Sequence, residues 1–289
     1  MVMMMQNRRL DLLVTFDENY IGPFRTMLTS VIMNNPGEKI HVWLLHSAIP
    51  QSKQEELGTY CAFQGVTLTP VRIERRIFEH APVSKQYPQE MYYRMLAPHL
   101  LPESAKKVLY LDPDILVINP LRPLWDLDLN GRTFAAAAHS GVTDIINGIN
   151  RVRLDTEHDY FNSGVMLMDL VKARTVVIPD EIFQCVREHE SDLLLPDQDV
   201  FNRLYGKHTL PVDDVIWNYD ARRYSDYLIR GGGAYHMDWV MKNTAILHFC
   251  GRRKPWRPSY ANRFAALYKN YMQIALRAGA SQTENGCTK

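Results

Sequence analysis

The chain has 289 residues, 46% of them apolar and 22% charged, which is the composition of an ordinary globular protein. Its net charge of +1 excludes a strongly basic nucleic-acid binder, so we expect no nucleic-acid partner. Four scattered cysteines argue against a disulfide framework or a cysteine zinc site, and no apolar run approaches the roughly 18 to 20 residues of a membrane span, so we predict a cytoplasmic protein.

Strand and helix patterns alternate along residues 10–73. A continuous apolar run over 10–16 predicts a strand covered on both faces, and apolar residues at helical spacing predict a helix over 21–32. Further strands are predicted over 41–45 and 66–73, with a helix over 50–64 between them. This order is typical of an α/β fold, with a mostly parallel central sheet and helices on both faces.

The segment KKVLYLDPDILVINP (106–120) places two carboxylates, Asp112 and Asp114, between apolar runs. Such a tripeptide is often only a turn, but a buried acid pair needs hydrogen bonds, a proton or a cation. Pro113 restricts the backbone between them, and paired oxygen ligands suit Mg²⁺ or Mn²⁺. Because ligands bind at the carboxyl ends of parallel strands, we expect 17–20 and 112–114 to face one crevice.

The rest of the chain continues the alternation. We predict strands over 133–138, 164–170 and 245–249, and helices over 179–189 and 198–205. The polar, aromatic-rich stretch 213–243 is interpreted as a long loop, and 259–277 as a final helix with one apolar face. Residues 251–277 carry seven Lys or Arg and no acid, so this helix could lie on an anionic membrane or simply pack on the core.

Polar residues interrupt apolar context at three further places. His248 ends a predicted strand and is followed by Gly251 and Lys254, a pattern that fits either a diphosphate-binding turn and a third metal ligand or a core histidine beside a solvated turn. The pairs Asn162-Ser163 and Asp197-Gln198 each precede an apolar segment. Taken singly these are ordinary caps, but capping does not explain several such clusters in one α/β chain.

Six segments, in this order, resemble glycosyltransferase family 8, the retaining enzymes that include bacterial lipopolysaccharide galactosyl- and glucosyltransferases and glycogenin. The segments are TFDENY with the helix after it, YYRMLAPHLLP, KVLYLDPDILV, YFNSGVMLMDL, LPDQDVFN and LHFCGRRKPW. The resemblance spans roughly residues 10–257. It implies a GT-A catalytic domain over 1–257, followed by a C-terminal helix and flexible tail over 258–289.

The resemblance also implies a UDP-sugar donor and Mn²⁺, with Mg²⁺ as the alternative cofactor. The implied metal ligands are Asp112, Asp114 and His248. The implied nucleotide and diphosphate contacts are Thr15, Asp17, Asn19, Tyr20, Gly251 and Lys254. The implied donor-sugar and catalytic residues are Arg94, Asn162, Ser163, Asp197 and Gln198. Where the family often places an acid near the donor sugar, this chain has His139 and Ser140, which leaves galactose and glucose both open.

The function expected from the resemblance is transfer of a hexose to a saccharide or lipid-linked saccharide. The expected location is the cytoplasm, with peripheral contact to the inner face of the plasma membrane left open. An amide such as Gln198 is a poor nucleophile, so front-face transfer is implied rather than a covalent intermediate. Two alternatives remain open. One is a self-glucosylating initiator similar to glycogenin, with one of fifteen tyrosines as acceptor, and the other is a nucleotide-sugar-binding protein without turnover.

Overall fold

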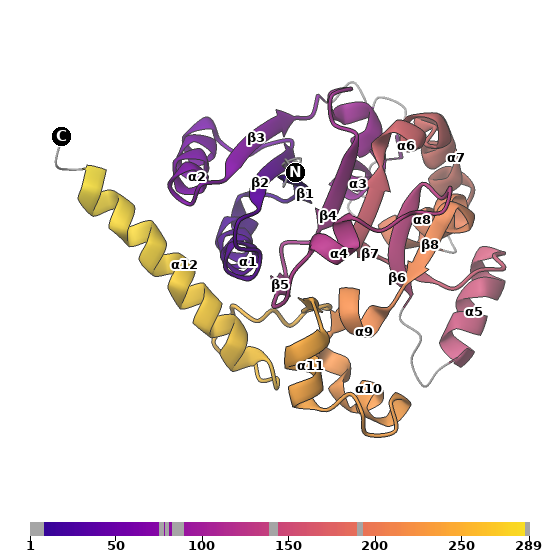
Figure 1. The fold of residues 1–289 in the computed structure, drawn as a ribbon. Coiled ribbons are helices and arrows are strands. Elements are labelled where there is room, and N and C mark those ends of the chain that lie inside the picture. The colour runs from indigo at the N-terminus through magenta and orange to yellow at the C-terminus, as the bar shows by residue number, and fades with distance from the viewer. Residues whose placement is uncertain are drawn as a thin grey trace, which may run out of the picture.

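The computed structural model describes residues 9–74, 78, 81–82, 90–138, 144–189 and 193–286. Its centre is a seven-stranded sheet in the order β3-β2-β1-β4-β7-β6-β8 (Figure 1). The strands are β1 (Arg9–Thr15), β2 (Lys39–His46), β3 (Thr67–Arg72), β4 (Lys107–Leu111), β6 (Phe134–Ala138), β7 (Phe161–Asp169) and β8 (Thr209–Val212). Only β7 runs antiparallel to its neighbours β4 and β6, so the predicted mostly parallel sheet is confirmed.

Helices cover both faces of this sheet, as the apolar strand sequences predict. Leu13 of β1 packs in one core with α3 (Glu90–Leu100), α6 (Leu170–Val176), α7 (Pro179–Glu188) and α8 (Pro196–Tyr205). Leu12 and Val14 pack in the opposite core with α1 (Ile21–Asn34), α2 (Gln51–Phe63) and α4 (Arg122–Trp125). Because successive side chains of a strand alternate between faces, a strand that is apolar throughout is buried on both sides.

A second, three-stranded sheet brings distant segments together. It pairs β10 (Ile246–His248) with β5 (Ile115–Val117) in antiparallel register and with β9 (Tyr219–Asp220) in parallel register. His248 lies opposite Ile115, and the amide of Phe249 donates to the carbonyl of Asp114 at 3.0 Å. This pairing fixes the end of β10 beside the Asp112-Pro113-Asp114 turn.

The prediction of a long loop over 213–243 is wrong. This segment contains α9 (Asp214–Trp217), β9, α10 (Tyr224–Arg230) and α11 (Met237–Asn243). Elements this short span no more than two helical turns, so their apolar residues show no clear period in the sequence. Tertiary packing stabilises them instead, with Val215, Tyr227 and Val240 buried in a shared core.

The C-terminal helix exists, but its bounds differ from the prediction of 259–277. Helix α12 (Ala265–Gly286) begins later because Asn262 caps the turn before it, accepting from the amide of Phe264 at 2.9 Å. Its apolar face packs inward, with Tyr268 and Tyr271 buried, and it runs alongside α1 at the outside of the molecule (Figure 1). Within the described ranges, no helix combines the length and apolarity needed to cross a bilayer.

Helix α5 (Asp144–Leu154) lies on the side of the sheet where β6 and the edge strand β8 are found (Figure 1). His139 and Ser140, which the sequence comparison with the family singled out, lie outside the described residues.

Candidate active site

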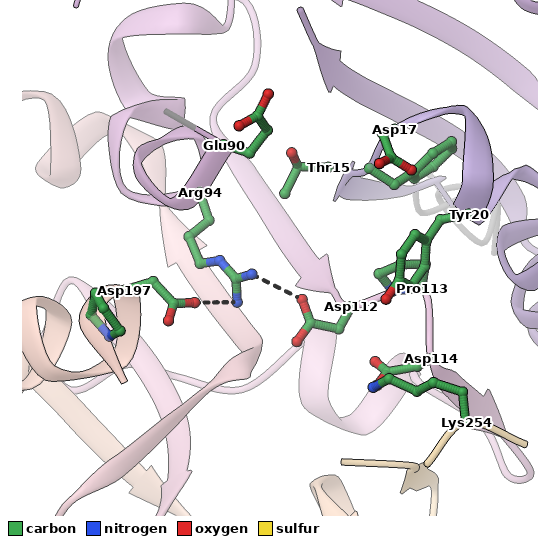
Figure 2. A pocket seen from close by; sticks show the side chains of 12 residues that line it. Thr15, Asp17, Tyr20, Glu90, Arg94, Asp112, Pro113, Asp114, Asp197 and Lys254 are labelled. Carbon is green, nitrogen blue, oxygen red and sulfur yellow. Dashed lines mark hydrogen bonds and ion pairs between the residues drawn. The ribbon is translucent and has the colours of Figure 1, made fainter. Parts of the chain in front are cut away.

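The carboxyl ends of β1 and β4 form the floor of a cavity of about 460 Å³. The two strands are parallel neighbours, so the residues that follow each strand emerge at the same edge of the sheet. Thr15, Asp17 and Tyr20 line the cavity from the β1 side, and Asp112 and Asp114 from the β4 side (Figure 2). The predicted common crevice is therefore present.

Asp112, Asp114 and His248 converge at this edge. One ligand atom from each lies within 4.8 Å of the others, and the imidazole Nε2 of His248 is 3.3 Å from Asp114 Oδ1 and 3.8 Å from Asp112 Oδ2. Gly164 lies directly beneath them, where an added Cβ would come within 2.4 Å of His248 Cε1 and 2.6 Å of Asp112 Oδ2. The set offers two hard oxygen ligands and one imidazole, which fits a small divalent cation such as Mn²⁺ or Mg²⁺.

Arg94 of α3 links the acid pair to the next group of polar residues. Its guanidinium is 3.2 Å from Asp112 Oδ1 and 3.4 Å from Asp197 Oδ2, as the dashed lines in Figure 2 show. It also donates to the Ser163 carbonyl at 3.0 Å and lies over the ring of Tyr110. Because these contacts come from three sides, the guanidinium is held in one position between the two carboxylates.

Positive groups surround the acid pair. Lys254 contacts Asp114 through its ammonium group, and the two side chains lie together in Figure 2. Burial raises the pKa of Asp112, although the nearby Arg94 opposes this effect. Burial would also raise the pKa of Asp114, but His248 and Lys254 outweigh it and lower that pKa. Burial alone would lower the pKa of His248, but Cys250 and Asp114 raise it. These carboxylates therefore need positive charge close by, the requirement that a divalent cation meets.

A second cavity, of about 490 Å³, adjoins the first and shares Arg94, Asp112, Asp114, Asp197 and Lys254 with it. Its walls contain the amide side chains of Asn162 and Gln198 and the hydroxyl group of Ser163. Asn162 and Ser163 belong to the start of β7, and Gln198 to the first turn of α8. The sequence-predicted sugar-side residues thus lie around one space, next to the acid pair.

Asp199 supports this arrangement from below. It is fully buried, accepts two hydrogen bonds of 2.8 Å from Arg153, and also accepts from the amides of Leu194 and Leu195. The Tyr160 hydroxyl donates to it as well, at 2.5 Å. Asp199 therefore anchors the segment that presents Asp197 and Gln198, which makes it a structural residue although it is not the N-cap of α8.

The nucleotide-side residues occupy the β1 end of the first cavity. Asp17 caps the turn Glu18–Tyr20, accepting from the amide of Asn19 at 2.9 Å. Asn19 itself is exposed and directs its side-chain amide to Asp17 rather than into the cavity. Tyr20 is half-buried and meets Trp256 edge-on, with ring centroids 5.4 Å apart. Asp17 and Tyr20 are thus brought to the site, whereas Asn19 lies at its margin.

Gly251 lies in the second cavity with a positive φ of 87°, a conformation that side chains other than glycine's rarely adopt. The Arg222 guanidinium lies over it, 2.6 Å from where a Cβ would stand. Several wall residues of this cavity were not predicted from the sequence: Asn150, Tyr160, Asp220, Arg222, Arg223 and Cys250. Asp220, Arg222 and Arg223 were missed because the 213–243 segment was interpreted as a loop.

Comparisons with known proteins agree with this geometry. The family model described as Glycosyl transferase family 8 matches residues 11–259. General stress protein A of Bacillus subtilis is 28% identical over 89% of this chain and 90% of its own. A lipopolysaccharide 1,2-glucosyltransferase of Escherichia coli K12 is 25% identical over 83% of this chain and 70% of its own. Among solved structures, galactosyltransferase LgtC superposes with a TM-score of 0.75 at 21% identity, over 92% of this chain and 96% of its own.

Proposed function

The chain belongs to glycosyltransferase family 8, and from this we propose that it transfers a hexose from a UDP-sugar to a saccharide or lipid-linked saccharide, with retention of configuration. Galactose and glucose are both compatible with the residues of the site. The GT-A fold expected from the sequence is confirmed by the likeness to LgtC. Within this fold, we assign the catalytic unit to residues 1–257.

The observation that carries the proposal is the convergence of Asp112, Asp114 and His248 beside a cavity that also contains Lys254 and Tyr20. Two of the ligands stand in the turn between β4 and β5 and the third ends β10, and β10–β5 pairing brings the two segments together. We propose that these residues hold Mn²⁺, which would offset the negative charge that develops on the departing diphosphate.

The chain's own groups can bind the nucleotide. The Tyr20 ring is positioned to stack on uracil, with Trp256 supporting it from the side. Asp17 offers carboxylate oxygens to the uracil end, since it lines the same cavity. We assign Lys254 to the diphosphate, because its ammonium already lies against Asp114 and can exchange part of that contact for a phosphate oxygen.

The cavity beside the acid pair offers hydrogen-bond donors and acceptors that can pair with the hydroxyl groups of a hexose. Asp197 presents a carboxylate held by Arg94, while Asn162, Ser163 and Gln198 present amide and hydroxyl groups. A site that hydrogen-bonds sugar hydroxyls rejects analogues that lack them, because its own polar groups are then left unpaired. We therefore assign donor-sugar recognition to these residues.

Front-face transfer is consistent with the groups present. Gln198, which the family resemblance places against the sugar, carries a neutral amide and is a poor nucleophile. In our proposal the acceptor hydroxyl attacks from the side of the leaving diphosphate, whose oxygen takes the acceptor proton. The carboxylate of Asp197 and the guanidinium of Arg94 position the sugar for that attack.

The test is hydrolysis of UDP-glucose and UDP-galactose by the purified chain, with and without added Mn²⁺. We expect slow release of UDP that requires the metal and that falls at least about 100-fold in Asp112→Ala, since removing a metal ligand removes charge stabilisation in the transition state. Metal-independent turnover, or equal rates in Asp112→Ala, would contradict the proposal.

Intact mass after incubation with the donor separates the acceptor alternatives. A saccharide acceptor leaves the protein mass unchanged, whereas a self-glucosylating initiator gains hexose increments. Metal-dependent binding of UDP without any hydrolysis or transfer would instead indicate a nucleotide-sugar-binding protein.

A further inference from the structure

Four side chains form a continuous hydrogen-bonded series behind the site. His248 Nδ1 lies 2.9 Å from Asn218 Oδ1, Asn218 Nδ2 lies 2.8 Å from Asn162 Oδ1, and Asn162 Nδ2 lies 3.0 Å from Gln198 Oε1. Asn218 is fully buried and belongs to the short connection between α9 and β9. The series therefore joins a candidate metal ligand to the donor-sugar residues through one amide that the sequence interpretation missed.

The direction of every bond in this series follows from one backbone group. The amide N–H of Gly164 can only donate, and it lies 2.9 Å from Asn162 Oδ1, so that atom of Asn162 must be the oxygen. The Asn218 atom that faces the same oxygen must then be its nitrogen, which donates. An amide in the flipped orientation would place a donor against the Gly164 N–H, and that arrangement is unfavourable.

The orientation of Asn218 determines which nitrogen His248 offers to the acid pair. With its nitrogen towards Asn162, Asn218 presents its oxygen to His248, so Nδ1 must carry a proton and donate. In the neutral imidazole the lone pair then lies on Nε2, the atom that faces Asp114 and Asp112. Metal-binding histidines are commonly fixed by such a bond from the other ring nitrogen.

The other end of the series orients Gln198. Because Asn162 donates through its nitrogen, the Gln198 atom that faces it is the oxygen. The Gln198 nitrogen is turned away from Asn162, on a residue that lines the sugar-side cavity. Gln198 therefore offers donors, rather than an acceptor, on its remaining side.

We propose that Asn218 is a positioning residue that couples the two halves of the site: its oxygen sets the ring nitrogen that His248 offers to the cation, and its nitrogen, together with the Gly164 amide, holds the Asn162 amide that orients Gln198. The inference rests on the proposed function. The oxygen of the Asn218 amide contacts His248 and its nitrogen contacts Asn162. The proposal therefore predicts that metal binding and the sugar-side amides can be disturbed by different substitutions of Asn218.

Two variants of Asn218 separate its contact with His248 from its contact with Asn162. Asn218→Leu removes both hydrogen-bonding groups at similar volume, and we expect the Mn²⁺ affinity in the presence of UDP to fall by about 10- to 100-fold. Asn218→Asp keeps an acceptor for His248 but places an oxygen against Asn162 Oδ1. We expect it to bind Mn²⁺ as tightly as the wild type or more tightly, while kcat for UDP-hexose hydrolysis falls at least about tenfold at saturating metal. Mn²⁺ binding is measured by electron paramagnetic resonance, independently of turnover.

Asn35→Leu is the matched control. Asn35 is also buried and also makes two hydrogen bonds, accepting from the Leu121 amide at 2.7 Å and donating to the Val31 carbonyl at 2.9 Å, but it lies outside the site. This control should lower the melting temperature and leave Mn²⁺ affinity and kcat unchanged.

The outcomes distinguish the two proposals. Wild-type affinity and kcat in both Asn218 variants would overturn the positioning role while the proposed function stands. Equal loss of Mn²⁺ affinity in both Asn218→Asp and Asn218→Leu would also overturn it, because the carboxylate keeps the bond to His248. If the wild type with UDP binds no Mn²⁺ and turns over no UDP-hexose, the proposed function fails, and this inference fails with it.

Discussion

Gly164 shows how closely the candidate site is packed around its ligands. It lies between His248, Asp112 and Asn162, and its backbone amide fixes the Asn162 oxygen. The position requires glycine for lack of space rather than for an unusual backbone, since its φ is not in the left-handed region. A methyl group there must displace either a metal ligand or the residue that orients the sugar-side amides.

Gly164→Ala should therefore disable the enzyme while leaving it folded. Displacing a ligand by about 1 Å can cost roughly 100-fold in rate, and we expect a loss of that size in metal-dependent UDP-hexose hydrolysis. Gly58→Ala in α2 is the matched control, because nothing lies within 4 Å of its added Cβ. That variant should keep full activity and gain up to about 1 kcal/mol of stability. Equal activity in both variants would show that the ligand cluster is not tightly packed.

Helix α8 shows how a single element can carry both a functional and a structural acid. Asp197 faces Arg94 and the cavities, whereas Asp199, two residues later, points to Arg153 and the preceding backbone. Residues two apart on a helix lie on different faces, so their roles differ although both stand in the motif LPDQDVFN. The motif alone does not distinguish the two acids, and the ion pair between Arg153 and Asp199 separates them.

Asp199→Asn should destabilise the fold by about 1.5 to 3 kcal/mol at neutral pH, because a neutral amide loses the charge-assisted hydrogen bonds that the carboxylate accepts from Arg153. Burial alone would raise the pKa of Asp199, but hydrogen bonds from Arg153 and Tyr160 hold it below the ordinary 3.8. A lowered pKa stabilises the fold above the unfolded value, and this contribution is lost as the pH falls through the folded value. In urea denaturation, the difference in free energy of unfolding between the wild type and Asp199→Asn should therefore decrease below pH 3.8.

The surface pair Arg223–Asp226 provides the control. Its nitrogen–oxygen distance is 2.9 Å, but the Asp226 side chain is 46% exposed. Exposed pairs contribute little, so Asp226→Asn should change the stability by no more than about 0.5 kcal/mol at any pH. A comparable loss in both variants would contradict the structural role given to Asp199.

Across the fold, the C-terminal helix is part of the core rather than an appendage. Phe264, just before α12, packs against Tyr219 of the small sheet, and Tyr268 of α12 packs against Phe249, which directly follows His248 of that sheet. Truncation before this helix would uncover that core, so loss of a function in a truncated chain would not identify a membrane contact. Since Tyr268 and Tyr271 of its apolar face are buried, α12 offers a membrane mainly its polar and charged side chains, with Leu276 as an exposed apolar residue.

We propose that exposed arginines around α12 give a peripheral contact with anionic membranes. Replacing Arg253, Arg257 and Arg277 with glutamine should weaken binding to phosphatidylserine vesicles by about 1 kcal/mol per charge, while the core remains intact. The control variant replaces Arg132 and Lys207, exposed near β6 and β8 at the other edge of the sheet. Co-sedimentation that is the same in the wild type and both variants would reject the membrane role.

The amino-acid sequence was sufficient to predict the α/β class, the order of the main strands and helices, the family, and the crevice between the ends of β1 and β4. These follow from local patterns, because apolar periodicity and turn residues report on each element separately. The folded structure was needed to show that Asn218 lies behind His248, that Arg94 lies between Asp112 and Asp197, and that 213–243 folds into short elements. Each depends on contacts between segments far apart in the chain, and an amide or a short helix carries no periodic signal that would indicate its partner.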